Sequence, residues 1–317
     1  MMALKVEADV VSYSAGISAC EKCEQWQWAV ALFSEMLEAD IKPNDISRNA
    51  MISACEKGRQ WQRALTSLSE KLELEAKPDV IPTSSYNVGL SACEGGGQWE
   101  RALSLLCDMW KVKLVPTVLN YNAGIGACEK GGQWQHALSL LCGLREAEIE
   151  PETCSYSVAV TACARAGLWQ RALSLLRGLQ DVRLESDVIS YTAGISACEE
   201  AQRWEEAVWL LGDLQRAKLK PDVAGFNACL SACGKAGQWQ HALSLLHEIE
   251  CKDLSPDLTS FNAAVSACET AEQWQSALSV MVGIHEAELA PDIVSYGAGI
   301  GACAKFGEWR QVADWHC

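Results

Sequence analysis

Cysteine and histidine are the residues in this chain most suited to metal binding or nucleophilic catalysis, because the sequence contains 16 cysteines and five histidines. A zinc site needs clustered ligands, yet the single Cys-x-x-Cys motif, Cys20 and Cys23, has no second pair or suitable histidine nearby. The histidines form no triad-like set with a nucleophile. The glycine runs do not follow a strand, as a phosphate-binding loop would. We therefore expect no metal, no cofactor and no enzymatic activity.

Nine of the cysteines are periodic, and each stands six residues before a tryptophan: Cys20, Cys55, Cys93, Cys128, Cys163, Cys198, Cys233, Cys268 and Cys303. Equivalent residues of stacked helical repeats lie about 8–10 Å apart. That separation exceeds the limit of about 7 Å between the Cα atoms of a disulfide. We therefore interpret these cysteines as small apolar core residues, in a protein from a reducing compartment.

The tryptophans that follow these cysteines recur at one spacing: Trp26, Trp61, Trp99, Trp134, Trp169, Trp204, Trp239, Trp274 and Trp309. Seven of the eight intervals are 35 residues, and the interval from Trp61 to Trp99 is 38. A period of this size is typical of a solenoid built from tandem copies of one unit. Nine copies of 35 account for 315 of the 317 residues, which leaves no room for a second domain.

Each copy predicts two helices. In the first, residues 10–22 and 26–37 both place apolar side chains at helical spacing, a short turn separates them, and Pro43 prevents further helix. Two antiparallel helices per copy predict an all-α solenoid whose first helices line the concave side. Because tryptophan opens the second helix, away from that side, we interpret the tryptophans as core residues and not as a stacking platform for bases.

The repeats are expected at residues 10–44, 45–79, 80–117, 118–152, 153–187, 188–222, 223–257 and 258–292. Residues 1–9 are interpreted as the tail of a preceding repeat and residues 293–317 as a partial ninth, so we expect a segment of a longer array or an array with ragged ends. The third repeat has three extra residues between Val80 and Ser85, expected at Pro82, Thr83 and Ser84, where they would lengthen a loop. The first residues match neither a signal peptide nor a transit peptide, and no apolar run reaches the ~18 residues of a membrane helix.

Two stretches, VVSYSAGISAC and VISYTAGISAC, with the closing motifs KPN and KPD, resemble pentatricopeptide repeats. That family has a 35-residue unit, which opens with two small apolar residues, a polar residue, Tyr and Asn, and closes with Pro-Asp. The resemblance covers residues 10–317 and recurs nine times in register. It implies a right-handed superhelix of two-helix hairpins that binds single-stranded RNA, about one base per repeat. It also implies a chloroplast or mitochondrial protein, although a cytoplasmic one stays open.

In the family, the fifth and thirty-fifth residues of a unit choose the base together. The resemblance maps these roles onto Ser14 with Asn44, Asn49 with Asp79, Asn87 with Thr117, Asn122 with Glu152, Ser157 with Asp187, Thr192 with Asp222, Asn227 with Asp257, and Asn262 with Asp292. The ninth unit offers Gly297 without a partner. Asn supplies a donor and an acceptor, Ser and Thr a hydroxyl, and Asp acceptors only. The second residues would sandwich the bases: Val11, Ile46, Leu119, Ile189 and Val294, with Cys154, Ala224 and Thr259 as weaker versions.

The residue types leave a structural interpretation open beside the recognition role. An Asp that precedes a helix is also an N-cap, which contributes about 1 kcal/mol; this applies to Asp79, Asp222, Asp257 and Asp292. An Asn inside a helix costs roughly 0.6 kcal/mol relative to Ala, which favours a recognition role for the Asn residues at the fifth position. By the family's pairing, the preferred RNA would be A, U, a pyrimidine, an unresolved base, G, G, U and U. Thr117 and Glu152 depart from the usual residues at the third and fourth of these bases.

A basic residue recurs near the end of the first helix: Lys22, Lys57, Lys130, Arg165, Lys235 and Lys305. These cations could contact phosphates or complement the helix C-terminus. The net charge of −15 opposes long-range attraction to RNA. We expect single-stranded RNA as the partner, with protein partners possible on the acidic surface. The alternatives are a protein-binding scaffold, favoured if carboxylates line the groove, and a decayed array with no stable ligand.

Overall fold

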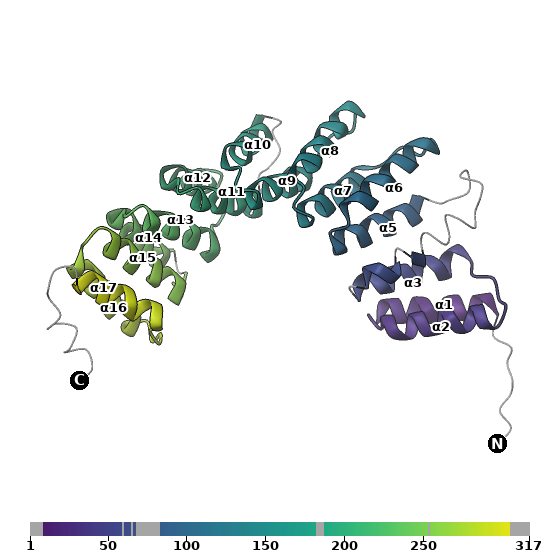
Figure 1. The fold of residues 1–317 in the computed structure, drawn as a ribbon, viewed down its shortest axis with the longest axis horizontal. Helices are drawn as coiled ribbons and strands as arrows, with labels where there is room; N and C mark the ends of the chain where they lie inside the picture. The colour runs from purple at the N-terminus through teal and green to yellow at the C-terminus, as the bar shows by residue number, and fades with distance from the viewer. Residues whose placement is uncertain are drawn as a thin grey trace, which may run out of the picture. The chain divides into compact units, whose positions relative to one another are not determined.

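The computed structural model describes residues 9–58, 60–64, 66–67, 83–181, 187–252 and 254–304. Within these ranges the regular structure is helical and contains no strand (Figure 1). The first helices of successive repeats are α1 (Val10–Lys22), α3 (Asp45–Lys57), α5 (Thr83–Gly96), α7 (Val118–Lys130), α9 (Thr153–Arg165), α11 (Val188–Glu200), α13 (Val223–Lys235), α15 (Leu258–Thr270) and α17 (Ile293–Ala304). The second helices are α2 (Trp26–Glu38), α6 (Trp99–Lys111), α8 (Trp134–Glu146), α10 (Trp169–Asp181), α12 (Trp204–Arg216), α14 (Trp239–Cys251) and α16 (Trp274–Glu286). The chain is an all-α solenoid of helical hairpins, as expected.

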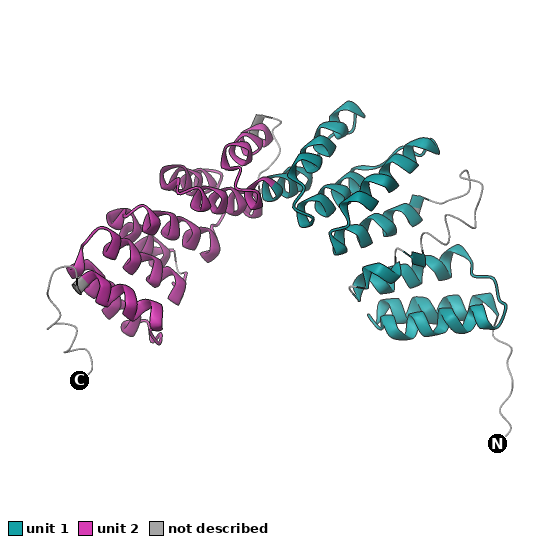
Figure 2. Cartoon of the chain, in the orientation of Figure 1, with its two compact units in different colours: residues 1–162 teal, residues 163–317 magenta. Residues whose placement is uncertain are grey.

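The chain forms two compact units, residues 1–162 and residues 163–317 (Figure 2). In unit 1 the first helices α1, α3, α5 and α7 pack against one another in sequence. The second helix α6 packs on its own first helix, α5, and on the next one, α7. In unit 2 the first helices α11, α13, α15 and α17 repeat this arrangement, with α12, α14 and α16 behind them. Each unit therefore has a layer of first helices and a layer of second helices, and the layer of first helices is continuous.

The helices begin and end at residues that the chemistry of helix termini selects. The side chains of Asp9, Asn44 and Asp257 each accept a hydrogen bond from the backbone N–H three residues later, at 2.8 Å. At the other end, the N–H groups of Glu24 and Gln25 bond the carbonyls of Glu21 and Cys20, which is the Schellman pattern. Such turns need a left-handed residue after the helix, and Glu24 has a φ of 57°.

The core lies between the two layers. The fourth residue of the second helices is alanine and fully buried, which lets the two helices of a hairpin approach closely; examples are Ala29, Ala102, Ala137, Ala207, Ala242 and Ala277. The periodic cysteines on the first helices lie in the same layer. Cys55, Cys93, Cys128, Cys163, Cys198, Cys233 and Cys268 are 0% exposed, and no disulfide joins the cysteines that the structure describes. Their expected role as small core residues is confirmed.

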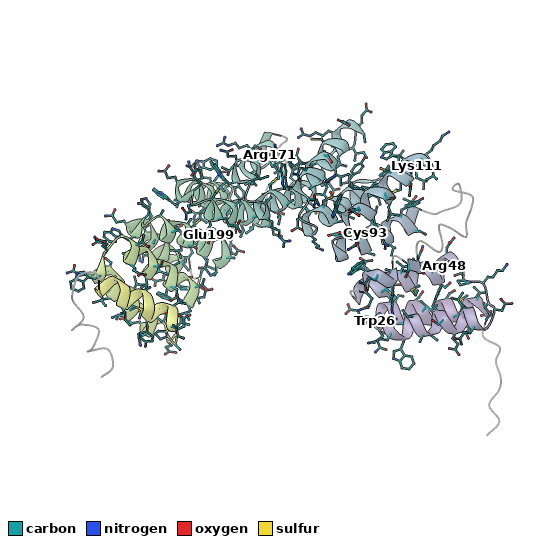
Figure 3. The ribbon with its side chains drawn as sticks, in the orientation of Figure 1. Trp26, Arg48, Cys93, Lys111, Arg171 and Glu199 are labelled. Atoms are coloured by element: carbon teal, nitrogen blue, oxygen red, sulfur yellow. The ribbon has the colours of Figure 1, made fainter. Side chains whose placement is uncertain are left out.

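The tryptophans join each repeat to the next. They are half-buried, and Trp26, Trp61, Trp239 and Trp274 pack against the hydrophobic core (Trp26 is labelled in Figure 3). The turn of the following repeat lies on the indole: a Cβ at Gly131 would come within 2.6 Å of Trp99. The interpretation of these tryptophans as packing residues is therefore confirmed where the structure describes them.

The start of α5 differs from the expectation for the third repeat. Thr83 and Ser84, assigned to the insertion, lie in the first turn of this helix, so they replace the usual first two helical residues. As a result Asp79 stands four residues before its helix, whereas Asn44 immediately precedes α3. The sequence could not reveal this, because the small polar residues Thr83, Ser84 and Ser85 suit a loop or a helix start equally.

Candidate nucleic-acid interface

An exposed apolar residue and a polar residue lie side by side at the start of several first helices. Residues three apart share one face of a helix, so Val11 lies beside Ser14 and Ile189 beside Thr192. The predicted sandwich residues Val11, Ile46, Leu119, Ile189 and Val294 are between 60% and 70% exposed. The weaker versions Cys154, Ala224 and Thr259 are exposed as well. Apolar side chains so open to solvent contribute little to the core, and their recurrence at one position of the repeat leaves them available to a ligand.

Three predicted pairs are in direct contact in unit 2. The Asn227 amide Nδ2 donates to both carboxylate oxygens of Asp257 at 3.1 Å. The Asn262 amide donates to Asp292 at 3.2 Å. The Thr192 hydroxyl lies 3.4 Å from the acceptor Oδ1 of Asp222. Each pair therefore joins the first helix of a repeat to the last residue of that repeat, which caps the next first helix.

The pairs of unit 1 are connected in two ways. The Ser14 hydroxyl lies 3.2 Å from Oδ1 of Asn44. Asn87 and Thr117 meet through Asn120, whose Nδ2 donates to Asn87 Oδ1 at 2.6 Å and whose Oδ1 accepts from the Thr117 hydroxyl at 2.9 Å.

The remaining predicted pairs show fewer hydrogen bonds between their two members. Asn122 is connected to the backbone of Glu152 through Ser155, at 2.6 and 3.2 Å. Ser157, in unit 1, donates to the Thr153 carbonyl at 2.8 Å. Asp187, in unit 2, caps α11. Asn49 accepts from Ser85 at 3.1 Å, while its predicted partner Asp79 lies outside the described residues.

The third residue of each repeat is a functional candidate that the sequence analysis missed. Ser260 and Ser295 are fully buried, and their hydroxyls donate to the carbonyl oxygens of Asn227 and Asn262 at 2.5 Å. A signal was present, because Ser recurs three residues after the Asp or Asn cap. That spacing has an ordinary explanation as part of a helix start, which hid its contact with the previous repeat.

Hydrogen bonds keep the carboxyl groups of Asp257 and Asp292 ionised, so these groups act as hydrogen-bond acceptors. Burial acts to raise the pKa of Asp257, but hydrogen bonds from Ser260 and from Asn227 outweigh it, and the pKa is lowered. At the exposed Asp292, the hydrogen bonds from the backbone and hydroxyl of Ser295 lower the pKa. Both carboxylates are therefore ionised at neutral pH, where they accept and cannot donate.

Three of the six cations in the predicted phosphate row form ion pairs with glutamates. Lys57, Lys130 and Lys235 lie 3.2, 3.9 and 3.0 Å from Glu21, Glu94 and Glu199, which precede them by one repeat. Glu199 is labelled in Figure 3. Other members of the row, Lys22 and Arg165, are exposed, and Lys305 lies outside the described residues. The sequence showed a Glu beside several of these cations, but the ion pairs run between repeats.

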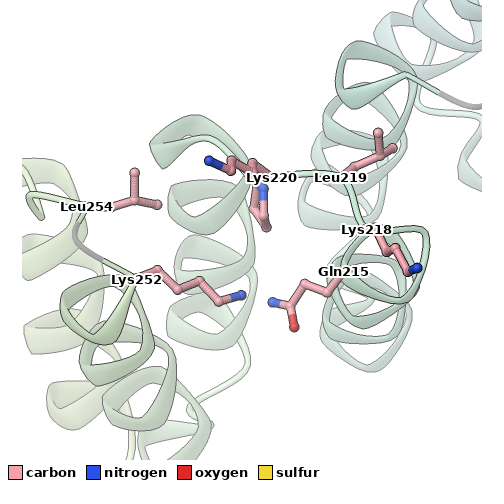
Figure 4. Close-up of a pocket in the computed structure, with 7 residues that line it drawn as sticks. Gln215, Lys218, Leu219, Lys220, Lys252 and Leu254 are labelled. Carbon is pink, nitrogen blue, oxygen red and sulfur yellow. The ribbon is translucent and has the colours of Figure 1, made fainter.

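A cavity of about 350 Å³ lies beside the loop that joins α12 to α13 (Figure 4). It is lined by Gln215, Lys218, Leu219, Lys220, Pro221, Lys252 and Leu254. Lys252 forms an ion pair with Glu248 at 2.8 Å, so part of the local positive charge is compensated. The sequence did not predict this cavity, because its lining comes from the exit loops of two repeats.

Two searches among the described residues gave no further site. No group of three or more His, Cys, Asp or Glu side chains is arranged to hold a metal ion in that part of the chain. Likewise, no described helix is long and apolar enough to cross a membrane.

Comparison with protein families explains the repeated geometry. The model of the PPR repeat family matches residues 8–70 and 221–270, the pentatricopeptide repeat domain matches residues 73–131 and 174–236, and a further PPR repeat model matches residues 154–182. The chain belongs to the pentatricopeptide repeat family. A comparison with curated proteins returned no match.

Solved pentatricopeptide repeat proteins share the fold of this chain. The structure of PPR10 in complex with an 18-nt psaJ RNA element matches with a TM-score of 0.74 and 18% identity, over 98% of this chain and 45% of that one. The structure of PPR10 from maize matches with a TM-score of 0.62 and 19% identity, over 98% and 49%. The PPR domain of Arabidopsis thaliana protein-only RNase P 1, in complex with tRNA, matches with a TM-score of 0.50 and 13% identity, over 59% and 95%. The chain thus spans about half the length of the PPR10 chains.

Proposed function

We propose that this chain binds single-stranded RNA sequence-selectively, with about one base per repeat, and acts in organellar RNA processing, stabilisation or translation. The observation that carries the proposal is the direct contact of Asn227 with Asp257 and of Asn262 with Asp292. Each pair offers amide donors and carboxylate acceptors to a base edge. The PPR10 structure in complex with RNA supports it at the level of the fold.

The exposed apolar residues supply the second half of the site. A base that enters between two repeats would meet Ile189 or Val294 on its face and a polar pair at its edge. Single-stranded RNA suits such a site, because its unpaired bases can be splayed apart and recognised on their Watson–Crick edges. A duplex hides those edges.

A binding assay with three oligonucleotides tests the proposal. The first is the eight-base RNA A, U, C, A, G, G, U, U, which fixes the pyrimidine as C and the unresolved base as A; the others are a scrambled RNA and the matching DNA. We expect the matched RNA to bind most tightly, since each well-formed pair contributes about 1–3 kcal/mol of base discrimination. Equal, weak binding to all three would remove the proposal.

A double variant assigns recognition to one repeat. Asn227→Ala with Asp257→Ala removes the pair of the seventh repeat, so preference at the seventh base should fall about tenfold, while preference at the eighth base is unchanged. The eighth base serves as an internal control, because Asn262 and Asp292 remain. A uniform loss at every base would indicate damage to the solenoid and not loss of a reader.

The acidic character of the chain favours a second candidate, a scaffold for protein partners. The net charge is −15, and glutamates from the preceding repeats pair with Lys57, Lys130 and Lys235. A scaffold would bind none of the three oligonucleotides selectively, so the same assay separates the two functions.

A further inference from the structure

The hydrogen bonds around Asn227 run in one direction. A backbone N–H can only donate, and that of Asp257 donates to the Ser260 hydroxyl oxygen at 3.2 Å. The hydroxyl has one proton, and the Asn227 carbonyl oxygen lies 2.5 Å away, closer than the Asp257 carboxylate at 2.9 Å. Ser260 therefore directs its proton to the Asn227 oxygen.

The other side of the amide is fixed in the same sense. The ionised Asp257 carboxylate accepts only, and it faces the Asn227 nitrogen at 3.1 Å. A rotation of the amide by 180° would place its oxygen against the carboxylate, where two acceptors would face each other, and would remove the hydrogen bond that Ser260 donates to that oxygen. Asn227 is thus held with its oxygen toward the protein and its NH₂ group toward Asp257.

We call this series of hydrogen bonds, from a backbone N–H through the third residue of a repeat to the fifth-position Asn of the preceding repeat, the relay. The same relay occurs elsewhere in the chain. The Asp292 N–H, Ser295 and Asn262 repeat it at 3.2 and 2.5 Å. Between the third and fourth repeats the relay uses an amide instead of a hydroxyl: Asn120, the third residue of the fourth repeat, accepts from the Thr117 N–H at 2.8 Å and donates to Asn87 at 2.6 Å. The chemistry is preserved although the residue differs.

Two repeats that have a hydroxyl residue instead of Asn at the fifth position, those of Thr192 and Ser14, do not show this relay. The fifth residue of the sixth repeat is Thr192, and the third residue of the repeat that follows is Gly225, which has no side-chain donor. Ser14 is followed by Ser47, which is fully buried but donates to the Asn44 carbonyl at 2.9 Å. Thr192 and Ser14 have a hydroxyl and no amide whose orientation must be fixed. The absence of the relay at these residues therefore agrees with a role in orienting Asn.

We propose that the third residue of a repeat is a positioning residue that orients the fifth-position Asn of the preceding repeat, and so selects uridine over cytidine. This inference rests on the proposed RNA binding. Uridine presents a carbonyl acceptor beside its N3–H donor, which complements an outward NH₂ group beside a carboxylate. Cytidine has an amino donor and an unprotonated N3 at those places, and it would require the rotated amide.

The first experiment compares the wild type with Ser260→Ala and Ser260→Asn, using the eight-base RNA with U or C at the seventh base. Ser260→Ala should lower the U-over-C ratio about fivefold to tenfold, as expected for the loss of one hydrogen bond, and leave the eighth base unaffected. Helix α15 keeps its cap, because Asp257 accepts from the Ser260 backbone N–H at 2.8 Å. Ser260→Asn should restore the ratio, since Asn120 at the same position of the fourth repeat donates to Asn87.

Ser47→Ala is the matched control. It removes an equally buried hydroxyl from the same position of a repeat, but that hydroxyl does not contact the fifth residue. The preference at the first base should not change. A change as large as that of Ser260→Ala would show that loss of any buried third-position hydroxyl alters recognition, and would overturn the proposal.

The second experiment needs no RNA, so it separates this inference from the proposed function. The NMR signal of the Asn227 side-chain NH₂ group should shift in Ser260→Ala and return in Ser260→Asn, while that of Asn262 stays in place. An unchanged Asn227 signal would overturn the positioning role whether or not RNA binds. A shifted signal with an unchanged U-over-C ratio, in a protein that selects U, would overturn the selection step alone. A wild type that binds no RNA would overturn the selection step together with the proposed function, and the NMR signal would still decide the positioning role.

Discussion

At the residue before a first helix, capping the helix and contacting the fifth-position Asn do not exclude each other. Asp257 accepts the backbone N–H of Ser260, which makes it an N-cap, and it accepts the amide of Asn227, which makes it half of a polar pair. A carboxylate has about four lone-pair positions, so one bond does not prevent the other. The cap fixes the carboxylate in place, at the position where the proposed RNA binding requires an acceptor.

Burial separates the cysteines into two chemical classes, which alkylation can measure. Burial raises the pKa of Cys93 to about 12 and that of Cys55 to about 11, so these thiols carry almost no thiolate at pH 8. We expect iodoacetamide to modify the folded protein first at the exposed cysteines, Cys23, Cys107, Cys142, Cys154 and Cys251. Peptide mass spectrometry gives the order, and modification of Cys93 as fast as Cys107 would contradict it.

The same experiment with RNA locates the ligand. Cys154 is the second residue of its repeat, at a predicted sandwich position, whereas Cys107 and Cys142 lie on the second helices α6 and α8. RNA should slow the alkylation of Cys154 several-fold and leave Cys107 and Cys142 unchanged. Equal protection of all three would indicate that RNA does not follow the first helices.

At the scale of elements, the turns between the two helices of a hairpin require a left-handed residue. Gly132 and Gly237 occupy this position with φ of 69° and 66°, but Gln202 occupies it with φ of 56°. A non-glycine residue costs roughly 1–2 kcal/mol in this conformation. Gln202→Gly should therefore stabilise the protein by about 1 kcal/mol, seen as a higher midpoint of thermal unfolding.

The reverse substitution, Gly132→Gln, provides the matched comparison. A Cβ at Gly132 would meet no atom within 4 Å, so its effect comes from the backbone alone. It should lower the midpoint by a similar amount. If both substitutions shift the midpoint in the same direction, the left-handed conformation is not what limits these turns.

Local patterns predicted the helices well, and contacts between repeats were the part that they could not predict. Helix α1 runs from Val10 to Lys22, as the apolar spacing predicted. The ion pair of Lys57 with Glu21 joins residues 36 apart, and its geometry depends on how two repeats stack. The contact of Ser260 with Asn227 has the same origin. The sequence of a single repeat shows which residues can form contacts, but it does not show which residues of two repeats contact each other.

At the scale of the whole chain, charge decides how RNA could approach. Acidic and basic residues alternate near the ends of the first helices, for example Glu199 on α11 and Lys235 on α13. The expectation of either a positive groove or a carboxylate-lined one was too simple, because the two signs are paired across repeats. Exposed pairs of this kind are worth little in stability, but they cancel much of the field that phosphates would experience.

The salt dependence of RNA binding follows from this pairing. For single-stranded RNA, each neutralised phosphate adds about 0.7 to the slope of log K against log salt. Six unpaired cations would give a slope near −4, whereas we expect a slope shallower than about −2 for the wild type, because at least three of the six predicted cations are paired. The variant Glu199→Gln releases Lys235, and it should steepen the slope by about 0.7 and tighten binding at low salt.

Glu248→Gln is the control for that measurement, because it removes the same charge from unit 2 and releases Lys252 on the second-helix side, at the end of α14. If phosphates follow the first helices, Glu248→Gln should leave the slope unchanged. Equal effects of the two variants would mean that only total charge matters, and the lysine row would then lose its proposed contact with the RNA backbone. A steep wild-type slope would show that RNA phosphates displace the glutamates from their lysines. RNA binding would then have to break these ion pairs.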